Sequence, residues 1–142
     1  MKKRKSPKQL IEAKIWQLCK EIIRKRDGKK CFICGKKIIK NSSWHTGHCF
    51  PKSNCGLYLK YDLRNLHSSC YYCNINLGGN GARFILRLEE EYGKDFVDQL
   101  RKDLNEIVPD SMTFLEEIYK EHTKMAKWSK KRLINYLKDS HV

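Results

Sequence analysis

The sequence lacks any apolar run of the ~18 residues that a membrane-spanning helix requires. Its basic start is not followed by the apolar segment and small-residue cleavage site of a secretory signal. Seven cysteines without such a signal favour thiols or metal ligands over disulfides. We therefore expect a soluble, cytoplasmic protein that does not bind a membrane.

Acidic residues are scarce near the N-terminus. The first 40 residues hold 15 of the 30 lysines and arginines but only Glu12, Glu21 and Asp27 as acids, so they carry a net charge of +12 out of the chain's +14. Such a local positive field favours a polyanionic partner, most simply nucleic acid, because lysine and arginine neutralise phosphates. For residues 1–7 alone, a flexible basic arm that only aids solubility is an equally good interpretation.

This basic region continues into an expected helix at 8–28. Ile15 and Ile22 recur at helical spacing on one side of it, and Gly28 can adopt the left-handed conformation that ends a helix. Apolar residues make up only 40% of the 142 residues, against 32% charged. The length suits a single domain, 1–142, but its core is thin, and a bound metal would help to stabilise it.

The chain changes character at residues 29–80, which are rich in Gly, Asn, Ser, Cys and His. Two pieces, 44–50 and 57–61, have the composition of β-strands. From 81 to 142 the apolar spacing is helical again, and Asn80 is suited to cap the first helix of this part. Two further helices are expected, near 112–122 and 129–138.

Two CxxC motifs lie in the central region: Cys31 with Cys34, and Cys70 with Cys73. Each CxxC turn aims both sulfurs at one point, and Zn²⁺ takes four tetrahedral ligands at about 2.3 Å from sulfur. The two motifs supply that number, and the long segment between them adds little to the entropy of loop closure. A redox CxxC normally occurs in a βαβ pattern, which this sequence lacks. The spacing therefore predicts a structural zinc site.

Imidazole and amide side chains crowd around these motifs: His45, His48, Asn65, His67 and Asn74. Hydrolysis of a phosphodiester needs a base to activate water and a divalent cation to stabilise charge on the phosphate. Zinc enclosed by four cysteines has no open coordination position, so a second cation, Mg²⁺ or Mn²⁺, would be required. Any one of these side chains alone is more often a core or turn residue, but their crowding beside a metal cage favours a site.

This order of residues resembles the HNH (His-Me finger, ββα-metal) nucleases, and more closely the phage NinG (Rap) recombination endonucleases. The resemblance covers roughly residues 10–138. Its central motif is specific, whereas the flanking helices alone would be weak evidence. Four stretches carry it: IRKRDGKKCFICGK at 23–36, TGH at 46–48, LKYDLRNLHSSCYYCN at 59–74 and GGN at 78–80.

The resemblance implies a role for each motif residue. His48 would be the general base, Asn74 a ligand of the catalytic cation, and Asn65 the residue that holds the His48 imidazole. The broader HNH pattern has an aspartate before the base, where this chain has Gly47. A further ligand for the cation would then come from elsewhere. The substitutes that we expect are Asp62, as the first choice, and His45.

The resemblance also implies a fold and a function. We expect an α+β protein with a zinc-bound ββα-metal core at 29–80, flanked by N- and C-terminal α-helices. Its activity would be metal-dependent cleavage of branched or Holliday-type DNA, by a phage- or prophage-encoded homodimer in a bacterial host. The residues expected to bind DNA phosphates are Arg24, Lys25, Arg26, Lys29, Lys30, Lys52, Lys60, Arg64, Arg83 and Arg87.

Two other functions are compatible with the sequence. The first is a non-catalytic, zinc-stabilised module that binds nucleic acid, favoured by the basic first 40 residues and by the missing aspartate before His48. The second is a restriction- or homing-type HNH nuclease that reads sequence in duplex DNA. Metal-dependent nicking that depends on His48 separates an enzyme from the first alternative, and comparison of junctions with matched duplexes tests the second.

Overall fold

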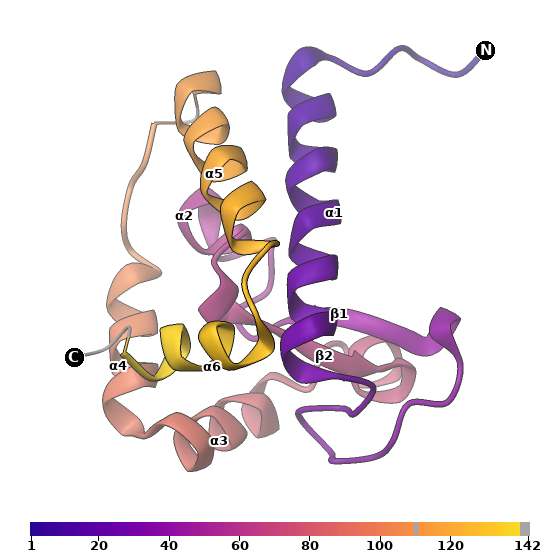
Figure 1. Ribbon diagram of the computed structural model, residues 1–142, viewed down its shortest axis with the longest axis vertical. Helices are drawn as coiled ribbons and strands as arrows, with labels where there is room; N and C mark the ends of the chain where they lie inside the picture. The colour runs from indigo at the N-terminus through magenta and orange to yellow at the C-terminus, as the bar shows by residue number, and fades with distance from the viewer. Residues whose placement is uncertain (110, 140–142) are drawn as a thin grey trace.

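The computed structural model describes residues 1–109 and 111–139, which form helices around a small two-stranded sheet (Figure 1). This is the α+β class expected from the sequence. In chain order the elements are α1 (Pro7–Asp27), the 3-10 helix η1 (Asn41–Ser43), β1 (Trp44–His48), α2 (Gly56–Lys60), the 3-10 helix η2 (Leu63–Asn65), β2 (Leu66–Cys70), the π-helix η3 (Tyr72–Asn76), α3 (Gly81–Tyr92), α4 (Lys94–Asp103), α5 (Met112–Met125) and α6 (Lys130–Asp139).

The long helix α1 packs against α5, α6 and both strands (Figure 1). It begins at Pro7, because the Ser6 hydroxyl accepts a hydrogen bond from the Gln9 backbone amide at 3.2 Å and the Gln9 side chain accepts one from the Ser6 amide at 2.9 Å. It ends at Asp27, and Gly28 follows with a φ of 72°. The predicted helix is confirmed to within one residue at each end.

Strands β1 and β2 pair in antiparallel register, with Trp44 opposite Cys70 and Gly47 opposite His67. The expectation of a second strand at 57–61 is wrong, because that segment lies in and just after helix α2, and the partner strand is β2. The sequence of β2, LHSSC, contains no β-branched residue that would indicate a strand. Its first four residues are nevertheless buried. Since successive strand residues point to opposite faces, both faces of β2 are covered.

The core consists of two apolar clusters. One joins the cysteine-rich region to α3 and α4 through buried residues such as Ile33, Phe84 and Phe96. The other lies between α1, β2 and the C-terminal helices, and includes Ile22 and Leu115. Together they fix α1 on one side of the sheet and α3 near the cysteines.

The C-terminal part is helical as predicted, and α5 and α6 lie close to the expected positions. Asn80 immediately precedes α3, but it has a φ of 52° and its side chain caps no helix amide. That side chain instead donates to the sulfur of Cys73 at 3.8 Å. Among the described residues, none of the helices has the length and apolar character needed to cross a membrane.

Candidate metal-binding and catalytic site

The two CxxC motifs converge on one point. The Sγ atoms of Cys31, Cys34, Cys70 and Cys73 all lie within 4.8 Å of one another, and those of Cys34 and Cys70 are 3.8 Å apart. Four sulfurs placed tetrahedrally at about 2.3 Å from a zinc ion would be about 3.8 Å from each other. The cluster therefore fits a metal such as zinc, which these four cysteines could hold.

Backbone and side-chain amides support this cluster. The first motif lies in the turn after α1, where the Gly35 amide donates to the Cys31 carbonyl at 2.9 Å. The second motif spans the end of β2 and the start of η3, where the Cys73 amide donates to the Cys70 Sγ at 3.4 Å. The Asn80 side chain also points at the Cys73 sulfur. Such N–H donors orient thiolate ligands and stabilise their charge.

His48 is the last residue of β1, and its ring is fixed by the backbone of Lys60. Its Nε2 lies 2.9 Å from the Lys60 carbonyl oxygen. Because a carbonyl can only accept, Nε2 carries the proton, and Nδ1 of the neutral ring is free to accept one. Burial lowers the pKa of His48, and the positive charges of Lys52 and Lys60 lower it further. The ring is therefore mainly neutral at pH 7, the form that can act as a base.

Asn74 lies on η3 and is held by His45. The Asn74 side-chain nitrogen is 3.1 Å from Nδ1 of His45, and since that nitrogen can only donate, Nδ1 accepts. The Asn74 oxygen faces Gly47, where an added Cβ would lie 3.4 Å away from it. The ring of Tyr71 packs edge-on against His45, with centroids 5.8 Å apart. His45 thus sets the orientation of the Asn74 amide.

Asn65 is fully buried and ties together the two ends of the segment between the strands. Its Nδ2 donates to the carbonyls of Phe50 at 3.0 Å and Leu59 at 3.2 Å, and its Oδ1 accepts from the Phe50 amide at 2.8 Å. Leu59 directly precedes Lys60. Asn65 therefore supports the backbone that holds His48, whereas the direct contact with the imidazole comes from the Lys60 carbonyl.

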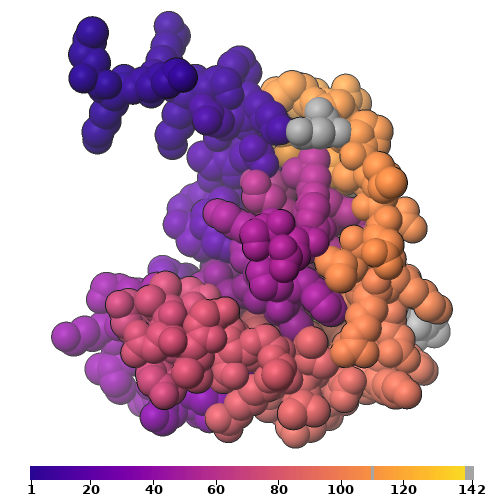
Figure 2. Space-filling model, turned by 180° about the vertical axis from the view of Figure 1, so that it is seen from behind, coloured from indigo at the N-terminus to yellow at the C-terminus, as the bar shows by residue number. Residues whose placement is uncertain are grey.

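His48 and Asn74 line the same groove, which has a volume of about 470 Å³. This volume is within the range of ligand sites in proteins. In Figure 2 the surface is recessed between the N-terminal segment, at the top, and the segment around residues 70–80, at the bottom. The other residues that line the groove are Lys5, Gln9, Glu12, Ala13, Trp16, Thr46, Lys52, Lys60 and Tyr61.

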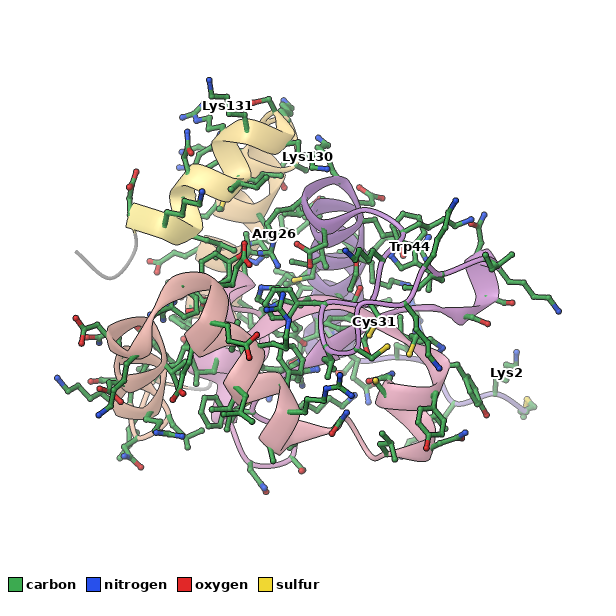
Figure 3. The ribbon with its side chains drawn as sticks, turned by 90° about the horizontal axis from the view of Figure 1, so that it is seen from below. Lys2, Arg26, Cys31, Trp44, Lys130 and Lys131 are labelled. Carbon is green, nitrogen blue, oxygen red and sulfur yellow. The ribbon has the colours of Figure 1, made fainter. Side chains whose placement is uncertain are left out.

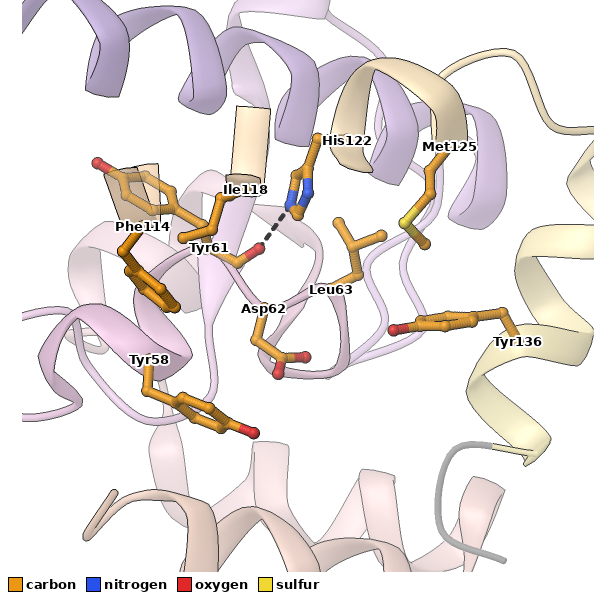
Figure 4. A pocket seen from close by; sticks show the side chains of 9 residues that line it. All are labelled: Tyr58, Tyr61, Asp62, Leu63, Phe114, Ile118, His122, Met125 and Tyr136. Carbon is orange, nitrogen blue, oxygen red and sulfur yellow. Dashed lines mark hydrogen bonds between the residues drawn. The ribbon is translucent and has the colours of Figure 1, made fainter. Parts of the chain in front are cut away.

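Asp62, the expected source of a carboxylate, lies in a different pocket from His48 and Asn74 (Figure 4). That pocket is about 200 Å³ in volume and also contains His122, whose Nε2 is 2.7 Å from the Tyr61 carbonyl. The Asp62 carboxylate accepts from the Arg64 guanidinium at 2.7 Å and from the Arg64 amide at 2.9 Å. The structure therefore does not bring Asp62 together with the expected site residues.

The acid in the groove is Glu12, which sequence reasoning did not identify. Of the described residues that line the groove, Glu12 is the only one with a carboxylate. It belongs to a face of α1 formed by Gln9, Glu12, Ala13 and Trp16. These positions recur at the i, i+3, i+4, i+7 spacing of one helical face. This face lies beside the apolar stripe of the helix and carries polar and aromatic side chains. That pattern is the sequence signal that could have indicated a helix face lining a site.

Two residues expected to bind DNA are internal, which corrects the expectation. Arg26 is only 3% exposed and lies among the side chains at the centre of the molecule (Figure 3). It donates to Asp27 at 2.7 Å and to the Leu63 carbonyl at 2.9 Å. Arg64 is also buried and pairs with Asp62 and with Asp103, at 2.7 and 2.8 Å. All three guanidinium nitrogens of Arg26, and Nε and Nη2 of Arg64, donate to groups within the fold, so they are not available to phosphates.

The other expected phosphate ligands fall into three groups. Four of them donate to backbone carbonyls: Arg24, Lys25, Lys29 and Arg87. Arg24 in addition lies over the Trp44 ring, 4.7 Å from its centroid. Lys60 lines the groove and pairs with Glu12 at 3.1 Å. The remaining three, Lys30, Lys52 and Arg83, are exposed.

Comparisons with known proteins agree on one family. The family model described as "NinG: Bacteriophage Lambda NinG protein" matches residues 1–132. The chain is similar to proteins named "Protein ninG": 31% identical over 88 residues to that of Salmonella phage P22, 29% over 90 residues to that of Escherichia phage 933W, and 28% over 90 residues to that of Escherichia phage lambda.

These alignments cover 61% of this chain for phage P22 and 63% for the other two. They span only 42% of the P22 protein and 43% of the 933W and lambda proteins, so the chain matches less than half the length of these relatives. No solved structure matches the chain significantly.

Proposed function

The chain belongs to the NinG family, and from this membership and the groove shared by His48 and Asn74 we propose that it is a metal-dependent DNA endonuclease of the HNH (His-Me finger) type. The observation that carries the proposal is a partly buried imidazole with its proton on Nε2, in the same groove as an oriented side-chain amide. Phosphodiester hydrolysis needs a base for the attacking water and a ligand for a cation.

His48 is the base in this proposal. Its Nδ1 takes a proton from water as the water oxygen attacks phosphorus, and the bond to the 3′ oxygen breaks. The 3′ oxygen leaves as an alkoxide and takes its proton from solvent water. The Lys60 carbonyl, which accepts a hydrogen bond from Nε2, stabilises the imidazolium that forms. Trp16 stacks on the same ring, with centroids 5.2 Å apart and planes 8° from parallel. The ring can therefore gain a proton without changing its orientation.

Asn74 is the protein ligand proposed for the catalytic cation, Mg²⁺ or Mn²⁺. Magnesium usually keeps several waters and takes few protein ligands in addition to substrate phosphates, so one amide oxygen in the groove suits it. When bound, such a cation stabilises negative charge on the phosphate and on the leaving oxygen. His45 acts here by orienting the amide of Asn74, since its own Nδ1 accepts from that amide.

The four cysteines are proposed to hold a structural zinc ion. Their cluster links the turn after α1 to the junction of β2 and η3. Asn74 directly follows Cys73, so a metal at this point would fix the start of η3 relative to β1. A closed set of four thiolates leaves no position for water or substrate, which suits a structural role.

DNA is the proposed substrate. In a chain of net charge +14, Lys5, Lys52 and Lys60 line the groove. Lysines of this kind contact phosphates and position a strand without reading its sequence. The likeness to recombination endonucleases favours branched or Holliday-type DNA. A twofold junction has two equivalent strands to cut, which favours a homodimer.

One observation favours a non-catalytic, zinc-stabilised module that binds nucleic acid. Among the described residues, the cysteine quartet is the only group of three or more His, Cys, Asp or Glu side chains close enough to hold a metal. The proposed cation would therefore depend on an amide and on the substrate, without a cluster of carboxylates.

Cleavage assays test the proposed function. The zinc-loaded chain is incubated with Mg²⁺ or Mn²⁺ and with four-way, flap and matched duplex DNAs, beside His48→Ala. We expect metal-dependent cleavage, strongest on branched DNA, and a loss of about 10²–10⁴-fold in His48→Ala with DNA affinity retained. Binding without cleavage by the wild-type chain would favour the non-catalytic module. Cleavage of particular duplex sequences would favour a sequence-reading nuclease.

A further inference from the structure

Helix α1 does more than line one side of the groove, because two of its residues act on the surroundings of His48. Glu12 and Trp16 lie one turn apart on α1, and both line the groove that contains His48. Trp16 touches the His48 ring directly, in a nearly parallel stack. Glu12 approaches from the same helix face and reaches the residues at the end of α2.

Glu12 accepts hydrogen bonds from two consecutive residues there. Its Oε1 accepts from the Lys60 ammonium at 3.1 Å and from the Tyr61 hydroxyl at 2.8 Å. Lys60 and Glu12 are both largely shielded, with side chains 29% and 18% exposed. Burial raises the pKa of Tyr61, and its hydrogen bond to Glu12 raises it further, so the hydroxyl keeps its proton and stays a donor.

The same short segment holds the base. The backbone oxygen of Lys60 accepts from His48 Nε2, while the side chain of Lys60 binds Glu12. Lys60 therefore links Glu12 to the imidazole through two hydrogen bonds, one at its side-chain ammonium and one at its backbone carbonyl. Two groups of α1 thus act on His48 from different sides: Trp16 packs on the face of its ring, and Glu12 holds the side chains of Lys60 and Tyr61, beside the carbonyl that orients the ring.

We propose that Glu12 is a positioning residue for His48: by holding Lys60 and Tyr61, it fixes the carbonyl that keeps the imidazole proton on Nε2 and leaves Nδ1 directed to the substrate. The catalytic consequence rests on the proposed role of His48 as the base, but the structural consequence does not. Helix α1 then belongs to the active site, because it determines which ring nitrogen of His48, on β1, carries the proton.

Charge supports this assignment. The groups that face His48 are the ammonium of Lys60, which Glu12 neutralises, and that of Lys52. Lys5, Glu12 and the neutral Gln9, Trp16, Tyr61 and Asn74 complete the groove around them. Without Glu12, the Lys60 side chain would lose its acid and would be free to swing toward the substrate phosphate. The segment of Lys60 and Tyr61 would then lose both hydrogen bonds that Glu12 accepts from it.

The experiment compares Glu12→Gln and Glu12→Ala with the wild-type chain, all zinc-loaded. Glu21→Gln is the matched control, because Glu21 lies on an exposed part of the same helix. Nitrogen-15 NMR of the histidine rings reports which ring nitrogen of His48 carries the proton. We expect the Nε2–H form in the wild type and in Glu21→Gln, and a mixture of tautomers in Glu12→Ala. An unchanged His48 signal in Glu12→Ala would overturn the proposal.

Cleavage kinetics provide the second readout. A displaced base costs about 10- to 100-fold in the chemical step. We therefore expect kcat to fall by about that factor in Glu12→Ala while KM for DNA changes little, and Glu12→Gln to lie between, since glutamine can still accept from Tyr61. An unaltered kcat in Glu12→Ala contradicts the proposal. If the wild-type chain does not cleave DNA, the proposed function fails, and the NMR comparison still decides the positioning of His48.

Discussion

Gly47 lies directly against Asn74. A Cβ added at position 47 would come within 3.4 Å of the Asn74 side-chain oxygen and 3.1 Å of the Ser69 Cβ, which is closer than most packed side chains allow. The amide of Asn74 therefore uses the space beside β1 that a side chain at position 47 would need. This gives a physical reason for glycine before His48 in this chain.

We predict that Gly47→Asp lowers cleavage instead of adding a useful ligand. The new side chain must displace the Asn74 amide or Ser69, and overpacking of this kind typically costs about 1–3 kcal/mol of stability. The cleavage rate at fixed Mg²⁺, measured beside the thermal midpoint, separates loss of the site from loss of the fold. Faster cleavage by Gly47→Asp would mean that the groove has room for a carboxylate at this position.

Local sequence rules predicted the helices and the cysteine cluster because both follow from short-range patterns. Gly28 marks the end of α1, and the spacing of each CxxC places its two sulfurs together. Strand β2 was not predicted, because its residues carry no strand preference and are buried only by tertiary packing. Glu12 was missed for a related reason: no local pattern relates a residue on α1 to Lys60, 48 positions away.

The next prediction concerns Asn74 and His45. Asn74→Ala removes the proposed cation ligand, so cleavage should fall sharply in Mg²⁺ and recover in part with excess Mn²⁺, which binds protein ligands more tightly. His45→Ala should cause a smaller loss, because the Asn74 amide would remain but could rotate. Cleavage rates across a metal titration provide the measurement. Equal and complete losses in both variants, without recovery, would assign His45 a direct contact with the cation.

Removal of the metal should unfold the centre of the protein. We expect about one tightly bound zinc per chain, held by the two CxxC motifs, with its binding free energy forming part of the folding free energy. Cys70→Ser should lower the thermal midpoint and the zinc content together, and a chelator should have the same effect on the wild type. Cys19→Ser is the control, because Cys19 is buried away from the cluster and should retain zinc. A stable, zinc-free Cys70→Ser would contradict a structural metal.

Buried histidines should make the fold sensitive to acid. Burial, together with the positive charge of the nearby Arg26, lowers the pKa of His67 to about 3. Within the described residues neither ring nitrogen has a hydrogen-bond partner. The unfolded chain gains this proton near pH 6.5, whereas the folded chain gains it only near pH 3. The free energy of unfolding should therefore decrease by up to about 1.4 kcal/mol per pH unit as the pH falls between these values.

His67→Phe tests that account. The ring packs against Phe32, Phe84 and Tyr92, so phenylalanine suits its surroundings and cannot be protonated. Denaturant unfolding at about pH 7.5 and 5.5 should show a smaller pH dependence in the variant than in the wild type. An identical pH dependence would mean that other groups, such as His48 and His122, account for the acid sensitivity.

The last prediction separates basic residues that bind DNA from those that build the fold. Lys52 is exposed and lines the groove, so Lys52→Gln should weaken DNA binding and reduce the slope of log affinity against log salt by about one unit. Its stability should remain close to that of the wild type.

Arg26 is the contrasting case, because its guanidinium donates hydrogen bonds to Asp27 and to buried carbonyls. Arg26→Gln should leave those acceptors unpaired and lower stability by several kcal/mol, while the folded fraction keeps the wild-type salt slope. Binding isotherms across a salt series, with unfolding curves for both variants, test the two residues together. A reduced slope in Arg26→Gln would mean that this arginine reaches the phosphates, and an unchanged slope in Lys52→Gln would place the DNA outside the groove.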